Sequence, residues 1–322
     1  MKTNALKNMG WLIRREFWEH RGGFLWAPVI TGGIFLLLTI IGLVTAEVIG
    51  ARSGFSIGGS GNLQSIMKQM DAGDLSQVGL ALDVSMFSAT ALIFVVLGFV
   101  VFFYCLGALY DDRRDRSVLF WKSLPISNTS TVLSKVISAT VLAPVIAVIT
   151  GIVAGLLQLL IMAVVLSFHG INVWQLLVLA HPLQIAANLI AYVPLYVLWA
   201  LPSVGWLLLC SAWARSKPFL WAIALPVGTG LMLNWFGILG LLNLRGSWFW
   251  QHIGLRGLLS VFPGSETLAR LGDFRMHLDS SGLFDLSQIY QLLYQPSLWI
   301  GVAIGGLLLA GAVWCRRWRT DI

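Results

Sequence analysis

The sequence predicts an all-α membrane protein with six transmembrane helices. Hydrophobic residues make up 57% of the chain and charged residues only 11%, whereas soluble proteins carry about 25% charged residues. Six apolar stretches are long enough to cross about 30 Å of hydrocarbon as helices, which takes ~20 residues each. They are Trp26–Val48, Asp83–Leu109, Leu133–Ser167, Leu183–Trp213, Phe219–Leu242 and Ser297–Trp314.

The first predicted element is an amphipathic helix within residues 1–24, ahead of the first span. Apolar residues such as Met9 and Leu12 mix there with charged ones such as Lys7 and Glu16. This pattern favours a helix that lies in the membrane interface with its apolar face toward the lipid.

The basic residues predict the orientation of the spans. Fifteen of the 21 Lys and Arg lie in four segments: residues 1–21, residues 110–135, the pair Arg215 and Lys217, and residues 316–319. Cytoplasmic segments collect Lys and Arg, so both termini are expected in the cytoplasm of a multi-pass protein of the bacterial plasma (inner) membrane. Because the net charge of +7 is distributed in this way, no nucleic-acid partner is expected.

Residues 110–132 are predicted to form a cytoplasmic loop with a docking surface. Six charged residues in succession, Asp111 to Arg116, are followed by the bulky apolar run from Val118 to Trp121. A plain tether between two spans does not need four consecutive bulky apolar residues facing the cytosol, so we interpret the run as a contact for another protein.

The later spans contain features that affect helix packing. The fourth contains Pro194 and Pro202, and proline removes a backbone donor and bends helices. Two small-residue motifs, Gly151-x-x-x-Gly155 and Gly301-x-x-x-Gly305, permit close approach of helices. We expect this packing within one bundle rather than between two copies.

Residues 243–296 are predicted to form an outer loop with re-entrant helices before the last span. The segment is partly apolar, and Pro263, Gly264 and Ser265 interrupt it in the middle. Neither half is a convincing further span, so short helices that dip into the outer leaflet and are shielded by protein fit better.

The chain carries no motif for catalysis. It contains no GxxxxGK[ST] phosphate-binding loop and no HExxH metal motif, so the chain itself is not expected to be an enzyme or to hold a cofactor or metal. The interiors of the spans contain neutral polar residues, notably Gln158, Asn188 and Asn234, and almost no charge. Ion-coupled transport normally relies on ionisable groups inside the membrane, so energy for any transport is expected from elsewhere.

Taken together, these residues resemble the permease subunit of a type-2 ABC transporter over nearly the whole chain. The resemblance is carried by Ile13–Arg21 before the first span and by Asp111–Ser117 after the second. It continues through Phe120–Asn128, with its Leu-Pro-Ile-Ser sequence, into Leu133–Lys135, and through the long outer segment before the last span. The resemblance rests on the order of these features along the chain and not on any single motif.

The resemblance implies a single permease domain, residues 1–322, forming half of a twelve-span pore and acting as an exporter. Its partners would be a second permease subunit, identical or a paralogue, membrane lipid, and two copies of a cytoplasmic ATPase that binds ATP and Mg. The N-terminal helix would be the connecting helix of the family, and residues 111–128 would hold the coupling helix. The residues implied in coupling are Arg14, Arg15, Glu16, Asp111, Asp112, Arg113, Arg114, Asp115, Arg116, Phe120, Trp121 and Lys122. The candidates for lining the pore are Phe102, Phe103, Asn234 and Trp235.

Two alternatives stay open at this point. An ion-coupled secondary carrier would transport without ATP, and the sparse charge inside the spans disfavours it. A membrane anchor or sensor for an ATPase would transport nothing, and the sequence offers little against it.

Overall fold

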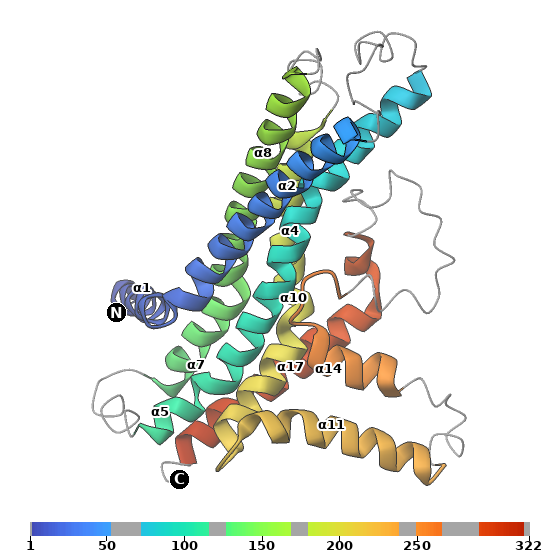
Figure 1. Cartoon of the computed structure of the whole chain (residues 1–322). Helices are drawn as coiled ribbons and strands as arrows, with labels where there is room; N and C mark the ends of the chain where they lie inside the picture. The colour runs from blue at the N-terminus through green and yellow to red at the C-terminus, as the bar shows by residue number, and fades with distance from the viewer. Residues whose placement is uncertain are drawn as a thin grey trace.

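The computed structural model describes residues 2–52, 72–115, 127–168, 180–237, 249–265 and 290–318. These residues are helical with no strand among them, and six of their helices are long and apolar enough to cross a membrane (Figure 1). For these residues the prediction of an all-α fold is confirmed, and so is that of six helices long and apolar enough to span a membrane.

The chain begins with two helices joined at a sharp turn. Helix α1 (Lys2–Glu19) is seen nearly end-on in Figure 1, whereas α2 (Ala27–Arg52) runs along the bundle. A π-helical turn, η1 (Gly22–Trp26), lies between them and buries the ring of Phe24 completely. The predicted N-terminal helix and first span are thus both present.

The second and third spans are longer than a bilayer requires. Helix α4 (Ala72–Ala108) begins eleven residues before the predicted start at Asp83 and is followed by the short α5 (Tyr110–Arg114). Helix α7 (Asn128–Ile137) continues through the π turn η2 (Ser138–Leu142) into α8 (Ala143–Phe168). At 1.5 Å per residue α4 alone is about 55 Å long, so part of it extends beyond the hydrocarbon.

The fourth and fifth spans differ from each other in packing. Helix α10 (Pro182–Trp213) stays one helix through both internal prolines and contributes many residues to the core. Helix α11 (Pro218–Trp235) buries little of itself and leaves the bundle at a steep angle (Figure 1). The predicted end of this span at Leu242 is wrong. Gly237 takes a left-handed φ of 63° and its N–H donates to the Asn234 carbonyl, which closes the helix earlier.

Residues 249–265 form a compact segment, called here the 249–265 hairpin, that packs against the middle of α10. It consists of the π turn η3 (Trp250–Gly254), α14 (Leu255–Leu259) and the turn that follows. The 3₁₀ turn η5 (Gln291–Tyr294) precedes the last span, α17 (Pro296–Trp318). The structure does not place a membrane, so the predicted re-entrant character stays a prediction.

Four side chains on one face of α10 satisfy polar groups of the 249–265 hairpin. The hydroxyl of Tyr196 donates to the carbonyl of Val261 over 2.7 Å, and the hydroxyl of Ser203 donates to the carbonyl of Arg256 over 2.9 Å. The hydroxyl of Tyr192 accepts a hydrogen bond from the N–H of Gly264 over 2.9 Å. The indole Nε1–H of Trp199 donates to the hydroxyl of Ser265 over 3.0 Å. Such partners are what irregular backbone needs when it lies at membrane depth.

Both small-residue motifs pack inside this chain. Gly305 of α17 lies against the backbone of Leu201 in α10, where an added Cβ would approach to 2.7 Å. Gly151 and Gly155 of α8 lie against Thr90 and Met86 of α4 in the same way. The expectation of close packing within one bundle is confirmed for both motifs.

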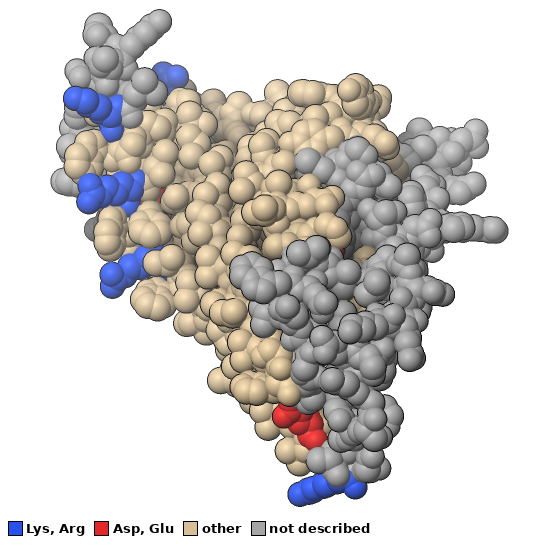
Figure 2. Space-filling view, turned by 90° about the horizontal axis from the view of Figure 1, so that it is seen from above, with Lys and Arg blue, Asp and Glu red and all other residues tan. Residues whose placement is uncertain are grey.

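Much of the outer surface is apolar. The Lys and Arg side chains visible in Figure 2 gather mainly along one edge, and most of the remaining described surface in that view is uncharged. Helices α2 and α11 expose large apolar side chains along their length, including Ile34, Leu38 and Leu231. Lipid or another membrane subunit has to cover these faces, since water would not.

Candidate functional site: a buried charge network at one end of the bundle

Five charged side chains meet where α1, α5, α7 and α17 come together. We call Arg15, Glu16, Asp112, Lys135 and Arg316 the charge network. Figure 1 shows the end of α17 close to α5 at this end of the bundle. Four of the five residues are buried, and the side chain of Arg15 is 21% exposed.

Glu16 is the first centre of the network and is only 1% exposed. Its carboxylate accepts a hydrogen bond from the ammonium of Lys135 over 3.1 Å and one from the hydroxyl of Tyr104 over 2.8 Å. Nη2 of Arg15 lies 3.4 Å from the same carboxylate. Through Glu16, the N-terminal helix is therefore bonded to α4 and α7.

Asp112 is the second centre. Its Oδ2 accepts a hydrogen bond from Nη1 of Arg316 over 2.9 Å and lies 3.6 Å from Nζ of Lys135. Its Oδ1 lies 3.9 Å from Nη2 of Arg15. Lys135 thus lies between two carboxylates, and the last span is connected to the end of α5.

Arg113 and Ser211 join α5 to the end of α10. The guanidinium of Arg113 donates to the carbonyls of Ser211 (2.7 Å) and Ala214 (2.8 Å). The Ser211 hydroxyl accepts the N–H groups of Leu109 and Tyr110. A cation on the last carbonyls of a helix is favourable because those carbonyls carry partial negative charge.

Burial makes these ion pairs structurally decisive. A buried pair contributes little net stability against an apolar replacement, but removing one partner leaves a buried charge and costs about 3–5 kcal/mol. The network therefore couples the positions of α1, α5, α7 and α17, since none of these helices can move away without leaving a buried charge of another helix unpaired.

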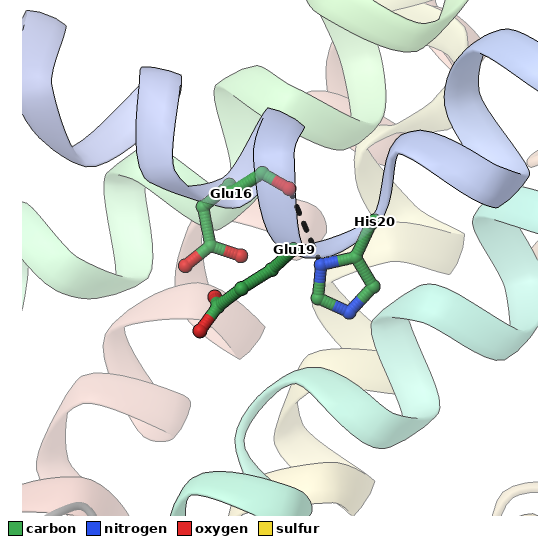
Figure 3. Close-up of side chains that lie close together, drawn as sticks. All are labelled: Glu16, Glu19 and His20. Carbon is green, nitrogen blue, oxygen red and sulfur yellow. Dashed lines mark hydrogen bonds between the residues drawn. The ribbon is translucent and has the colours of Figure 1, made fainter.

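Glu16, Glu19 and His20 form a second cluster on the last turn of α1. Figure 3 shows the three side chains close together. Their potential ligand atoms lie within 4.8 Å of one another. However, Glu16 is already paired with Lys135, and the Glu19 carboxylate accepts a hydrogen bond from Nε of Arg15 over 3.0 Å. The His20 ring is directed by its contact of 3.3 Å with the Glu16 carbonyl. Cations of the protein already neutralise both carboxylates, so we interpret the cluster as part of the ion-pair system.

An ionisable pair, Asp83 and His181, lies near the start of α10. Arg113 and Ser211 lie at the other end of the same helix. The Asp83 carboxylate accepts the backbone N–H of His181 over 2.9 Å and lies 3.0 Å from its ring Nδ1. A carboxylate at a helix start is favourable because the first N–H groups carry partial positive charge. This pair connects α4 to α10.

The predicted coupling residues separate into three groups. Arg14, Asp111, Arg114 and Asp115 are exposed at the charged end of the bundle. Glu16, Asp112 and Arg113 are buried, and Arg15 is partly so, and their side chains contact other helices of this chain. Arg116, Phe120, Trp121 and Lys122 lie outside the described residues. The buried residues of the predicted coupling set therefore hold the helices beneath the charged surface together, and they are not part of that surface themselves.

The pore-lining candidates are not brought together. Phe102 is buried and Phe103 exposed, and both rings contact Phe219 at the start of α11. Asn234 and Trp235 are exposed near the other end of α11. Fifteen residues of helix, about 22 Å, separate Phe219 from Asn234.

Tyr104, Lys135 and Arg316 belong to the site but were not among the predicted site residues. One signal for the site exists on α1: Glu16 follows Leu12 by four residues and thus shares its apolar face, and both are buried. A carboxylate on the buried face of a helix needs a cation from another element, and Lys135 is the basic residue at the start of the third predicted span.

Comparisons with known proteins give no match for this chain. No family model matches it, and neither does any curated protein or solved structure. Its function is therefore argued from its own residues.

Proposed function

We propose that this chain is the membrane-spanning subunit of an ATP-driven exporter of the type-2 ABC class, and that a separate cytoplasmic ATPase drives it. In this proposal the charged end of the bundle faces the cytoplasm. The 249–265 hairpin enters the membrane from the outer side, and a second permease subunit completes the pore.

The observation that carries the proposal is the charge network itself. It joins the N-terminal helix and the end of α5 to α4, α7 and α17, all at the end where basic residues gather. The segment between Asp115 and Ser127, which holds the predicted docking surface, connects α5, which carries Asp112, to α7, which carries Lys135. A displacement of that segment by an ATPase would reach several spans at once, because the connection is made of buried pairs.

A second observation supports a two-subunit pore. Helices α2 and α11 bury little of their apolar surface within this chain. These exposed apolar faces are available for contact with another membrane subunit. In the proposal the second permease subunit packs on this side, and the pore lies between the two subunits.

The mechanism in this proposal involves no covalent chemistry on the chain. Closure of two ATPase subunits would move the coupling segments, and the spans would exchange between an inward-open and an outward-open arrangement. The chain supplies a difference in stability between the two forms, and the partner supplies the hydrolysis.

The test is co-purification from the native host in mild detergent. A stoichiometric ATPase carrying a phosphate-binding loop is expected with the wild-type chain. Phe120→Ala and Trp121→Ala are expected to reduce its recovery at least tenfold while the chain still inserts. Phe168→Ala is the matched control, because Phe168 is an exposed aromatic at the far end of α8.

Three results would contradict the proposal. Recovery of the chain alone, under conditions in which other ABC complexes survive, would favour the carrier or the anchor. Undiminished ATPase recovery with both aromatic variants would remove the docking assignment. Transport by reconstituted chain that collapses with an ion gradient and ignores ATP would favour the carrier specifically.

A further inference from the structure

A cavity of about 650 Å³ lies between α10, α11, the 249–265 hairpin and α17. Its walls are mostly apolar and include Trp206, Pro226, Phe249 and Ile304. Arg256 of α14 also lines it. We call this cavity the Arg256 pocket.

Arg256 is held in place but leaves hydrogen-bond donors unused. Its guanidinium lies over the Trp199 ring at 4.6 Å from the centroid, a favourable cation–π arrangement. Its Nε and Nη2 are buried and have no hydrogen-bond partner among the described residues. None of the described lining residues is acidic. The pocket therefore contains a fixed positive charge that an anion would satisfy.

Gly301 makes room for this guanidinium. A Cβ added at Gly301 would overlap Nη2 of Arg256. The close contact means that the position of Arg256 depends on a missing side chain in α17, which supplies a way to displace the charge without removing it.

The pocket has a charged end and a long apolar wall, which matches the charged head and apolar tail of an amphiphile. On α17, Ile300, Ile304 and Leu308 follow one another at four-residue intervals and line one wall. Ile253, Ile300 and Ile304 are also partly exposed, so the apolar wall opens to the surface. Charge thus lies at one end of an apolar stripe that continues along the helix toward Arg316.

We infer from a neighbouring tryptophan that the charge lies within reach of the headgroup region. The exposed Trp299 ring on α17 is the kind of residue that prefers the headgroup region. Gly301, which touches Arg256, is two residues further, about 3 Å along the helix. A lipid phosphate can therefore reach Arg256 while the acyl chain follows the stripe into the hydrocarbon.

We propose that the Arg256 pocket binds an anionic membrane lipid, with its phosphate on the Arg256 guanidinium and an acyl chain along Ile300, Ile304 and Leu308. None of the four predicted pore-lining residues, Phe102, Phe103, Asn234 and Trp235, lines this pocket. It does not depend on the transport function, because binding is measurable on the purified chain without an ATPase.

The experiment measures retention of lipid by the full-length chain in detergent, by native mass spectrometry during titration. The probes are phosphatidylglycerol, phosphatidylcholine with the same acyl chains, and inorganic phosphate. Wild type is expected to retain phosphatidylglycerol at least about tenfold more tightly than phosphatidylcholine. Both lipids carry a phosphate diester, but phosphatidylcholine also carries a choline cation, which the buried guanidinium of Arg256 repels. Inorganic phosphate is expected to compete weakly, because it lacks the acyl chain.

Three variants separate charge from shape. Arg256→Gln and Gly301→Ala are each expected to remove the preference for phosphatidylglycerol, the second by displacing the guanidinium. Ile304→Trp fills the apolar wall and is expected to weaken both lipids while leaving Arg256 in place. Arg317→Gln is the control, since Arg317 is an exposed cation at the other end of α17.

Melting of each variant, followed with a thiol-reactive dye, identifies any that fail to fold. If Arg256→Gln misfolds, Gly301→Ala and Ile304→Trp still test the site. Equal retention of the two lipids by wild type would overturn the proposal. An undiminished preference in folded Arg256→Gln or Gly301→Ala would do the same, as would an equal loss in Arg317→Gln. A change in particle mass with Ile304→Trp and unchanged lipid retention would instead assign the pocket to a second copy of the chain.

Discussion

The most direct test of the charge network is Lys135→Met. Lys135 is 1% exposed and lies 3.1 Å from Glu16 and 3.6 Å from Asp112. Methionine keeps the length of the side chain but leaves Glu16 with only Tyr104 and the partly exposed Arg15. Stranding a buried charge costs about 3–5 kcal/mol. At ~2–4 °C per kcal/mol, the apparent melting midpoint is expected to fall by about 6–20 °C.

The assay uses the three cysteines of the chain as reporters. Cys105, Cys210 and Cys315 are buried thiols outside any disulfide, so a thiol-reactive dye gains fluorescence only as the bundle opens. Lys7→Met is the matched control, because Lys7 is exposed on α1 and surface changes of this kind stay within about 0.5 kcal/mol.

A second variant separates lost charge balance from lost packing. In Lys135→Met/Glu16→Gln the stranded carboxylate becomes a neutral amide, so at least half of the lost stability is expected to return. If Lys135→Met had the same apparent melting midpoint as the Lys7→Met control, the reasoning would be refuted, because the buried ion pairs would then not contribute to stability. A double variant less stable than the single one would show that packing, and not charge, was lost.

Three further predictions concern the packing of α4 and α10, each measured by the same melting assay. Gly98→Ala places a Cβ into the ring of Phe262 and is expected to cost about 1–3 kcal/mol; no further loss when it is added to Phe262→Ala would support the contact. Tyr196→Phe removes the hydroxyl that donates to the 249–265 hairpin and is expected to cost about 1 kcal/mol, so an unchanged midpoint would contradict that bond. Asp83→Asn keeps an acceptor for the His181 N–H and is expected to cost about 0.3–1 kcal/mol, whereas Asp83→Leu is expected to cost about 1–3 kcal/mol because it leaves that N–H unpaired. Equal losses in the two Asp83 variants would show that the charge alone matters.

The spans were predictable because hydrocarbon sets a minimum length for an apolar helix. The ends of the spans were less predictable, because the requirement for apolar residues does not apply outside the hydrocarbon. Helix α4 begins at Ala72, well before Asp83, because a helix can continue beyond the hydrocarbon whether its residues there are polar or apolar. Helix α11 ends at Trp235 because the conformation of Gly237, and not a loss of apolar residues, closes it.

The candidate site was predictable only in part. The run from Asp111 to Arg116 was correctly recognised as dense in charge, but sequence alone does not separate the buried Asp112 and Arg113 from their exposed neighbours. That separation depends on Arg316, about 200 residues away in the chain, and on the end of α10. Arg256 carried a weak signal as a single cation within an apolar run, and its unused donors are visible only once Trp199 and Gly301 are placed beside it.

The polar face of α10 also has a consequence for biosynthesis. Tyr192, Tyr196, Trp199 and Ser203 leave the ribosome at least 45 residues before the 249–265 hairpin that satisfies them. Until the hairpin arrives, α10 presents hydroxyl and indole groups to the bilayer or to the insertion machinery. Such groups are costly in lipid when unpaired, so α10 completes its burial only when the last third of the chain has been made. The C-terminal part therefore assembles as one unit, and a nascent chain stopped after α11 would offer chaperones and proteases a polar stripe that the finished protein hides.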